Sequence, residues 1–237
     1  MFLSRRATQA EYFDSPERSL AELADFHARL NSVNRFFVFA EPFQQALPKW
    51  LGPDSCQSLS ILDLGAGDGS LGKALTESAA KRGWRWRFTN LDLNVRALSL
   101  NGMGVNVAGS AIALPFRDES FDLVIASQMT HHLTDGGVLQ HLREAWRVAR
   151  VGIFLSDLHR NPTLYSCLWL LLRLWRYPKP FWNDGLLSVK RGWRVSELRR
   201  LAAQAGIGGA EVRLYFGARV LLRARKAEEK KLNGLKG

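Results

Sequence analysis

Residues 61–70, Ile61-Leu62-Asp63-Leu64-Gly65-Ala66-Gly67-Asp68-Gly69-Ser70, decide the fold of this 237-residue chain. The first four are typical of a buried strand, three alternating glycines follow, and a helical pattern begins at about Leu71. Glycine lacks the Cβ that would hold a ligand away, so such a strand–loop–helix lets backbone N–H groups approach a bound molecule. The segment therefore predicts a ligand-binding strand and loop of an α/β domain.

Two carboxylates flank this loop and restrict what can bind there. Asp63 and Asp68 would face the charges of a pyrophosphate, and a like-charge pair about 4 Å apart costs about 4 kcal/mol at an effective dielectric constant of about 20. The spacing G-x-G-x-G also differs from the G-x-G-x-x-G of dinucleotide-binding loops. Both observations disfavour NAD and FAD. They favour a ligand with a cationic head and no phosphate, such as S-adenosylmethionine, which carries an ammonium and a sulfonium.

A second acidic residue pattern follows one strand later. Residues 86–92, Trp86-Arg87-Phe88-Thr89-Asn90-Leu91-Asp92, are typical of a strand that ends in an acid. In nucleoside-binding α/β folds an acid at this place accepts hydrogen bonds from both ribose hydroxyls. The alternative is that Asp92 only caps the following helix. Together with the glycine loop, the ribose role is favoured.

A third segment completes the pattern. Residues 113–125 indicate a turn that leads into an apolar strand, and residues 126–133 follow with Gln128, His131 and His132. The D-L-G-A-G-D-G loop, the L-D-L acid, the A-L-P-F-x-D-x-S-F-D stretch and the H-H-L resemble class I S-adenosylmethionine-dependent methyltransferases, in matching order over residues 58–157. The resemblance implies an α/β fold with a doubly wound, mostly parallel seven-stranded sheet, N-terminal helices and a helical insertion after strand five.

The resemblance also implies which residues hold the cofactor, S-adenosyl-L-methionine. These residues are Asp63, Gly65, Ala66, Gly67, Asp68, Gly69, Asp92, Leu93, Ser110, Ala111, Gln128 and His131. The family often has an acid that accepts from the adenine amine where this chain has Ser110. A serine hydroxyl accepts that bond less strongly than a carboxylate, so lower cofactor affinity or a compensating side chain is expected.

The domain organisation follows from periodicity and from the resemblance. We expect an N-terminal helical cap that contributes to the substrate pocket (1–52), a cofactor-binding core (53–160), a helical lid insertion (161–192), a closing helix and antiparallel hairpin (193–227) and a basic tail (228–237). The helical part of the cap is expected to start at Ser15-Pro16-Glu17, with proline in the first turn.

Substrate specificity is expected in the cap and the insertion, because both are apolar and aromatic. The insertion contains residues 164–176, a broadly apolar helix with a narrow polar stripe, which indicates either a lid packed on the core or a lipophilic pocket entrance or interfacial contact. Residues 156–162 and 184–189 resemble small-molecule methyltransferases of polyketide and quinone pathways. This resemblance implies O-methylation of a lipophilic phenolic, polyketide or quinone-like acceptor.

Catalysis requires alignment of the acceptor and removal of its proton. The candidates follow strands four and five, at the carboxyl edge of the sheet. His159 is the expected base, Asp157 orients it or the substrate, and His132 is a further catalytic candidate. His131 is expected beside the cofactor. A structural role for each remains open, and we expect no metal.

Composition sets the remaining expectations. Two cysteines, no signal-peptide pattern and no apolar run long enough for a membrane span favour a cytoplasmic protein. The net charge of +11 fits either a solvated basic face or contact with RNA, an anionic inner-membrane surface or an acidic carrier. Without an RNA-binding pattern, nucleic acid is the less favoured partner. An RNA methyltransferase and a non-catalytic adaptor with this fold remain the alternatives, and oligomeric state is open.

Overall fold

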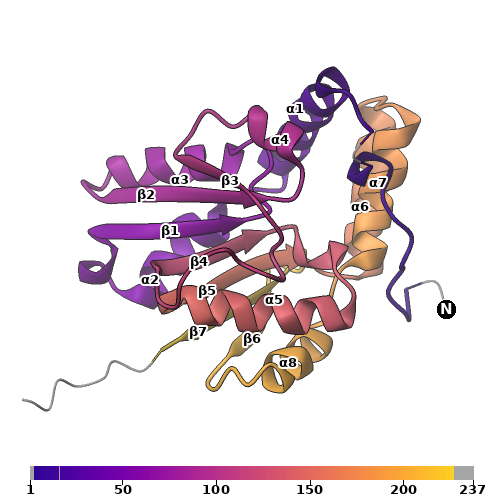
Figure 1. The fold of residues 1–237 in the computed structure, drawn as a ribbon. Coiled ribbons are helices and arrows are strands. Elements are labelled where there is room, and N and C mark those ends of the chain that lie inside the picture. The colour runs from indigo at the N-terminus through magenta and orange to yellow at the C-terminus, as the bar shows by residue number, and fades with distance from the viewer. Residues whose placement is uncertain (1–2, 16, 227–237) are drawn as a thin grey trace, which may run out of the picture.

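The computed structural model describes residues 3–15 and 17–226, which form a seven-stranded sheet with helices on both faces (Figure 1). The strands are Ser58–Leu64 (β1), Arg85–Asp92 (β2), Val105–Ala108 (β3), Phe121–Ser127 (β4), Ala149–Leu158 (β5), Glu211–Tyr215 (β6) and Arg219–Arg225 (β7). The α-helices are Leu20–Phe36 (α1), Leu47–Leu51 (α2), Ser70–Ala80 (α3), Val95–Ser99 (α4), Asp135–Val148 (α5), Pro162–Leu174 (α6), Lys179–Arg191 (α7) and Val195–Gln204 (α8). Short 3-10 or π-helical turns occupy Tyr12–Asp14 (η1), Pro42–Ala46 (η2), Asp54–Cys56 (η3) and Thr130–His132 (η4).

The strand order, β3-β2-β1-β4-β5-β7-β6, is that of a doubly wound sheet. β1 to β5 pair in parallel, and β7 inserts antiparallel between β5 and β6. The order reverses between β1 and β4, and ligands of open α/β sheets bind outside the carboxyl ends of the strands at such a switch point. The structure confirms the predicted fold class, including the closing hairpin around Gly217.

The carboxyl half of β1, residues 61–64, is buried on both faces of the sheet. Ile61 packs into a core cluster with η2, α2 and α3, whereas Leu62 and Leu64 pack into the cluster on the opposite face, which α5 and α8 cover. All three side chains are fully buried. Helices on both faces explain why the run Ile61-Leu62 breaks the apolar–polar alternation with which β1 begins.

Helix α1 begins later than the sequence analysis predicts. Its N-cap is Ser19, whose hydroxyl accepts from the backbone N–H of Glu22 (3.2 Å), while the Glu22 carboxylate accepts from the backbone N–H of Ser19 (2.8 Å). This reciprocal capping box satisfies two backbone donors at once, so it fixes the helix start at Ser19 rather than at Ser15.

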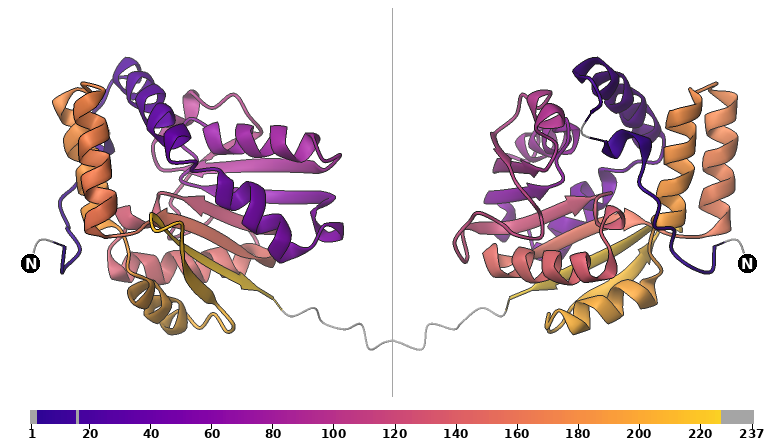
Figure 2. Two further views of the ribbon diagram at one scale, coloured as in Figure 1. Left: turned by 180° about the vertical axis from the view of Figure 1, so that it is seen from behind. Right: turned by 45° about the vertical axis from the view of Figure 1, so that its right-hand side comes forward.

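The insertion after β5 is a pair of helices, α6 and α7, that stand beside the carboxyl end of the sheet with α1 (Figure 2). The N-terminal segment runs across α7, where the Asp184 carboxylate accepts from the backbone N–H groups of Tyr12 and Phe13, both at 2.9 Å. In residues 3–15 and 17–226, no helix combines the length and apolar character that a membrane crossing requires. The predicted basic tail, 228–237, lies outside the described residues.

Candidate functional site

The glycine loop is held open by backbone conformations that favour glycine. Gly65, Gly67 and Gly69 have φ of +73°, +54° and +75°. A Cβ on Gly65 would lie 2.4 Å from Cγ of Met129, and one on Gly69 would lie 2.1 Å from Oδ1 of Asn101. The loop therefore needs glycine for its conformation and for close packing at the switch point between β1 and β4.

Asp92 ends β2 beside this loop, where a ribose-binding acid is predicted. Its Oδ2 accepts from the backbone N–H of Gly67 (2.9 Å) and its Oδ1 accepts from the backbone N–H of Asn94 (2.8 Å). The helix-cap alternative does not hold, because the cap of α4 is Asn94, whose side chain accepts from Arg96 and Ala97. Asp92 is half-buried, so each of its oxygens retains a lone pair for a ligand.

Asp63 is the most unusual acid of the loop region. Its residue is 1% exposed, and its Oδ2 is buried without a hydrogen-bond partner among the described residues. Burial, and then repulsion by Asp92, raise the pKa of the Asp63 carboxyl to about 8. An unpartnered buried carboxyl costs free energy unless a donor or a cation meets it. The cationic head of S-adenosylmethionine would supply that partner.

Helix α1 covers the same loop, which the sequence analysis did not predict. Asn31 donates to the Asp68 carboxylate (2.7 Å), and Nδ1 of His27 lies 3.8 Å from that carboxylate. A Cβ on Gly67 would lie 2.9 Å from the His27 ring. Burial lowers the pKa of His27 against the attraction of Asp68 and Asp92, so its ring favours the neutral form. The sequence signal was His27 and Asn31 four positions apart on one helix face.

The remaining predicted cofactor residues lie around this loop. Gly65 and Ala66 donate their N–H groups to the carbonyl of Leu91 (2.8 and 3.2 Å). Leu93 is 77% exposed beside Asp92, an apolar surface that an adenine ring can cover. Ser110 and Ala111 lie in the turn after β3, half-buried. Their cofactor contacts stay predictions.

His131 and Asp157 form a buried pair at the ends of β4 and β5. His131 Nδ1 lies 2.6 Å from Asp157 Oδ1, and each residue is 2% exposed. Asp157 also accepts from the hydroxyl of Thr130 and from the backbone N–H groups of His131 and Leu158. Burial alone would raise the pKa of Asp157, but His131 and these hydrogen bonds outweigh it and hold the pKa well below its usual range.

The structure therefore pairs Asp157 with His131, not with the predicted base His159. His159 lies at the end of β5 with its Nδ1 3.1 Å from the carbonyl of Gly217 and 2.8 Å from Nδ2 of Asn161. Asp157 is buried in β5, and its carboxylate is engaged by His131, Thr130 and backbone N–H groups. The catalytic role of His159 stays a prediction, but Asp157 does not orient it.

A second group of ionisable side chains gathers where the N-terminal segment crosses η4 and α7. Glu11, His131 and His132 offer ligand atoms that all lie within 4.8 Å of one another. Arg191 Nη1 lies 3.9 Å from Glu11 Oε1 and 3.5 Å from Asp14 Oδ2, and His132 Nδ1 lies 3.1 Å from Asp14 Oδ1. The Arg191 guanidinium thus places a positive charge beside the carboxylates of Glu11 and Asp14.

The surroundings of Glu11 change the pKa of its carboxyl. Burial, the largest influence, raises the pKa of its carboxyl to about 7, although His132, Ser188 and Arg191 oppose the rise. Ser188 Oγ donates to Glu11 Oε1 at 2.8 Å. Glu11 is not predictable from the sequence, because an acid among the aromatic residues of an N-terminal segment carries no signal of its burial against α7.

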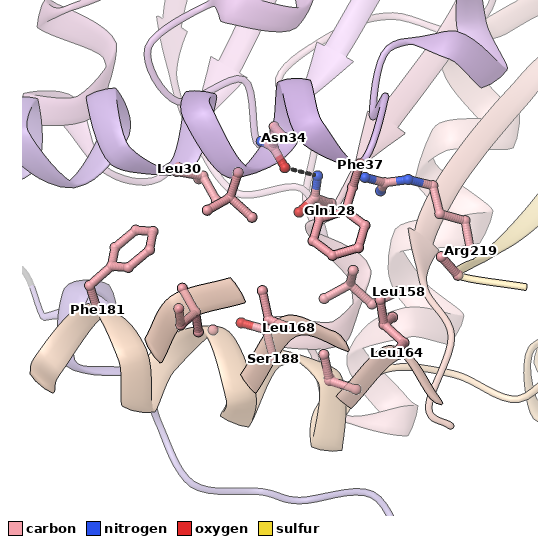
Figure 3. Close-up of a pocket in the computed structure, with 15 residues that line it drawn as sticks. Leu30, Asn34, Phe37, Gln128, Leu158, Leu164, Leu168, Phe181, Ser188 and Arg219 are labelled. Atoms are coloured by element: carbon pink, nitrogen blue, oxygen red, sulfur yellow. Dashed lines mark hydrogen bonds between the residues drawn. The ribbon is translucent and has the colours of Figure 1, made fainter. Parts of the chain in front are cut away.

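An apolar cavity of about 70 Å³ lies between α1 and the α6–α7 pair (Figure 3). Its polar lining is limited to four residues, Asn34, Gln128, Ser188 and Arg219, and leucine, valine and phenylalanine side chains dominate the rest. Gln128, at the end of β4, donates its amide to Asn34 Oδ1 (2.8 Å), as Figure 3 shows. Since α1 carries both Asn34 and the Asn31 that binds Asp68, one helix joins the cavity to the glycine loop. Gln128 lies at this junction, and its predicted contact with the cofactor stays a prediction.

Residues 62–155, which run from the carboxyl end of β1 to most of β5, match a family model described as a methyltransferase domain. This segment carries the glycine loop, Asp92, Gln128 and His131. Residues 62–155 form a methyltransferase domain. The resemblance to S-adenosylmethionine-dependent methyltransferases is therefore confirmed for this domain.

Three relatives extend this comparison. The chain is 42% identical over 69 residues to a demethylmenaquinone methyltransferase of Roseiflexus sp. and 52% identical over 70 residues to that of Roseiflexus castenholzii. These matches span 27% and 28% of this chain, and only 28% and 29% of the relatives' own lengths. A ubiquinone biosynthesis O-methyltransferase of Nitrosospira multiformis is 25% identical over 213 residues, which cover 76% of this chain and 84% of that protein.

Solved structures support the fold. Human N-acetylserotonin methyltransferase in complex with S-adenosylmethionine aligns with a TM-score of 0.61 at 18% identity, over 91% of this chain and 59% of that chain. An S-adenosylmethionine-dependent methyltransferase of Aquifex aeolicus aligns with a TM-score of 0.57 at 15% identity, over 88% and 99%. At these identities the likeness establishes the architecture alone.

Proposed function

We propose that this protein transfers a methyl group from S-adenosylmethionine to an oxygen of a lipophilic small molecule of phenolic or quinone-like type. The observation that supports this most strongly is the apolar cavity at Gln128, which adjoins the glycine loop through α1. An apolar pocket with a few convergent polar groups, at the switch point of an α/β sheet, is the usual form of a small-molecule site.

The residues of the loop fit the cofactor. The orphaned Oδ2 of Asp63 suits an ammonium, the half-buried Asp92 suits ribose hydroxyls, and the exposed Leu93 suits one face of adenine. Gly65 and Gly67 give the loop its left-handed backbone, and Met129 and His27 pack where a Cβ on these glycines would stand. When bound there, S-adenosylmethionine supplies a methyl group made electrophilic by its sulfonium.

The chain's own residues then align the acceptor, exclude water and take up its proton. Leu30, Phe37 and Leu168 wall the cavity, so an apolar ring held there is oriented and dehydrated. The acceptor oxygen bonds to the methyl carbon as the carbon–sulfur bond breaks, and the hydroxyl proton must leave to a base. The predicted base His159 is not among the residues that line the cavity.

Glu11 is the base that the geometry supports best. Its carboxyl, with a pKa of about 7, accepts from Ser188, and the Ser188 hydroxyl lines the cavity. In this scheme Ser188 passes its proton to Glu11 as it receives the acceptor proton. A base with a pKa near the working pH is partly ionised and still takes up a proton readily, which is the optimum for general-base catalysis. His159 and His132 stay the alternatives that the sequence favours.

The basic composition gives less support to an RNA substrate. Three of the cations, Arg160, Arg191 and Arg219, are each at most 6% exposed, so they cannot form a surface that follows a phosphate backbone. The three curated relatives are named for quinone-related methylation, which agrees with a lipophilic acceptor.

Label transfer from methyl-labelled S-adenosylmethionine tests the proposal. The full chain is incubated separately with alkylated phenols and quinols, with bulk RNA and with a protein lysate. We expect label in the organic extract of the phenol or quinol reactions, lost in Asp92→Ala and kept in Asp25→Ala, which changes an exposed acid of α1. Exclusive labelling of RNA, or binding of NAD in place of the cofactor, would overturn the proposal.

A further inference from the structure

Arg219 is a buried arginine whose side chain has no partner in the described part of the chain. Its residue is 4% exposed, it lines the apolar cavity (Figure 3), and its Nη1 is buried without a hydrogen bond. Among residues 3–15 and 17–226, no hydrogen bond or ion pair is formed by its side chain. Arg219 is the first residue of β7 and pairs with Leu158, the last residue of β5. The backbone therefore places Arg219 at the carboxyl end of β5.

Asp157 attracts the Arg219 guanidinium electrostatically, but its carboxylate already accepts hydrogen bonds from other groups. Both of its oxygens accept hydrogen bonds from His131, Thr130 and the backbone. The cavity lining contains no carboxylate, and its other polar groups are the neutral Asn34, Gln128 and Ser188. Burial lowers the pKa of Arg219 to about 10, against the attraction of Asp157, so the guanidinium remains charged at neutral pH.

A buried charge without a counter-charge is strongly unfavourable, and replacing it by an apolar side chain of similar volume would stabilise the fold. In a ligand cavity, a bound anion supplies the missing counter-charge and so offsets this cost. Guanidinium groups are suited to carboxylates and other anionic oxygens, which they bind through parallel N–H donors.

We propose that Arg219 selects acceptors that carry an anionic oxygen, which its guanidinium binds in the apolar cavity. This inference rests on the proposed function and adds the acceptor's charge to it. The acceptor class is an apolar or aromatic body bearing either a carboxylate or an ionised hydroxyl. A neutral molecule of the same shape leaves the guanidinium unpaired and binds less tightly.

Binding measurements, which do not require turnover, test this selectivity. Four probes are titrated in mildly alkaline buffer with saturating S-adenosylhomocysteine. They are para-butylbenzoate, its neutral methyl ester, neutral para-butylphenol, and the ortho-nitro derivative of that phenol, which is ionised. We expect the wild type to prefer at least one anionic probe over its neutral counterpart by about tenfold or more, which is about 1.4 kcal/mol. The benzoate arm identifies a carboxylate site and the nitrophenol arm an ionised hydroxyl site.

Arg219→Met should abolish the preference and leave affinity for the neutral probes and for S-adenosylhomocysteine unchanged. Its urea midpoint should equal or exceed that of the wild type, because the unpaired charge is gone. Arg219→Lys keeps the charge and should retain part of the preference. Arg213→Met, at an exposed arginine of the same hairpin, should behave as wild type.

A wild type that binds S-adenosylhomocysteine but does not distinguish anionic from neutral probes would overturn the Arg219 inference and leave the proposed function intact. An undiminished anion preference in Arg219→Met would do the same. Absence of S-adenosylhomocysteine binding would instead count against the proposed function.

Discussion

A single carboxyl, Asp63, connects cofactor recognition with stability at the residue scale. In the folded protein its pKa is raised to about 8, whereas the ordinary value is 3.8. The folded state therefore binds a proton more tightly than the unfolded chain, and stability falls as pH rises from about 4 through 8. A bound cation reverses this cost, since it favours the ionised carboxylate that is needed to hold it.

Replacing Asp63 with asparagine should separate these two effects. Without cofactor, Asp63→Asn should be more stable than the wild type at pH 8 by about 1–3 kcal/mol, with little difference near pH 4. Affinity for S-adenosylhomocysteine should fall at least about tenfold. Urea unfolding at both pH values and calorimetric titration measure this, and equal affinity in the two proteins would contradict the assigned role.

Glu11 gives a prediction for the pH dependence of turnover. Its raised pKa predicts that turnover increases with pH through about 7, as the carboxyl ionises and becomes able to accept a proton. Glu11→Gln should lose that inflection and about 10²-fold in turnover, with cofactor affinity unchanged. The exposed Glu77→Gln serves as control. An inflection that persists in Glu11→Gln and disappears in His159→Ala would show that His159 is the base.

Some residues of the site were predictable and others were not, for a physical reason. Asp63 and Asp92 stand at fixed positions of a strand–loop–helix pattern, so local sequence locates them. Glu11 is buried against Ser188 of α7, which is 177 residues away in the chain. Arg219 is buried because β7 inserts beside β5. In the sequence, Arg219 is one of many basic residues expected on a solvated face, and the structure corrects that interpretation.

Helix α1 is the element that joins cofactor loop and acceptor cavity. It contributes Asn31 to Asp68, His27 to Gly67, and Asn34 to Gln128. The existence of a helix here was predicted from its apolar face, whereas its start and its docking were not. The helix starts after the capping box of Ser19 and Glu22 and not at the proline in the predicted first turn. The docking of α1 depends on tertiary contacts, which periodicity does not encode.

The glycine loop gives a stability prediction at the element scale. Gly69 and Gly83 share φ of +75°, but only at Gly69 would a Cβ meet another group, Asn101 Oδ1 at 2.1 Å. Gly83→Ala should cost about 1 kcal/mol for the left-handed backbone alone. Gly69→Ala should cost about 1–3 kcal/mol more because of overpacking. Urea unfolding of both variants measures the difference, and equal losses would refute the packing argument.

At the scale of the whole molecule, an exposed apolar surface lies at the carboxyl-terminal ends of α1 and α6. It consists of Phe36, Val38, Trp169, Leu170, Leu174 and Trp175, each between 41% and 68% exposed. Phe36 and Trp175 meet edge to face at 5.8 Å, so the two helices share this surface. Exposed cations adjoin it at Arg173, Arg176 and Lys179. Aromatic, leucine and basic side chains together suit the boundary of an anionic membrane, from which a lipophilic acceptor could enter.

Vesicle binding tests this surface. We expect the protein to cosediment with vesicles containing phosphatidylglycerol and less with pure phosphatidylcholine, because the cations contribute. Leu170→Ser combined with Leu174→Ser should weaken binding about tenfold or more. Val105→Ser, an exposed apolar residue on β3 at the sheet edge, should not change it. Equal binding of the double variant and the wild type would exclude this surface as the contact.

The central claim is that the glycine loop and its acids hold S-adenosylmethionine, and calorimetric titration with S-adenosylhomocysteine tests it most directly. We expect one site per chain, with binding largely abolished by Asp92→Ala and by Gly67→Val, whose Cβ would enter the His27 contact. Asp25→Ala should bind as the wild type does, and NAD should not compete. Tight binding of NAD, or wild-type affinity in Asp92→Ala, would contradict the account.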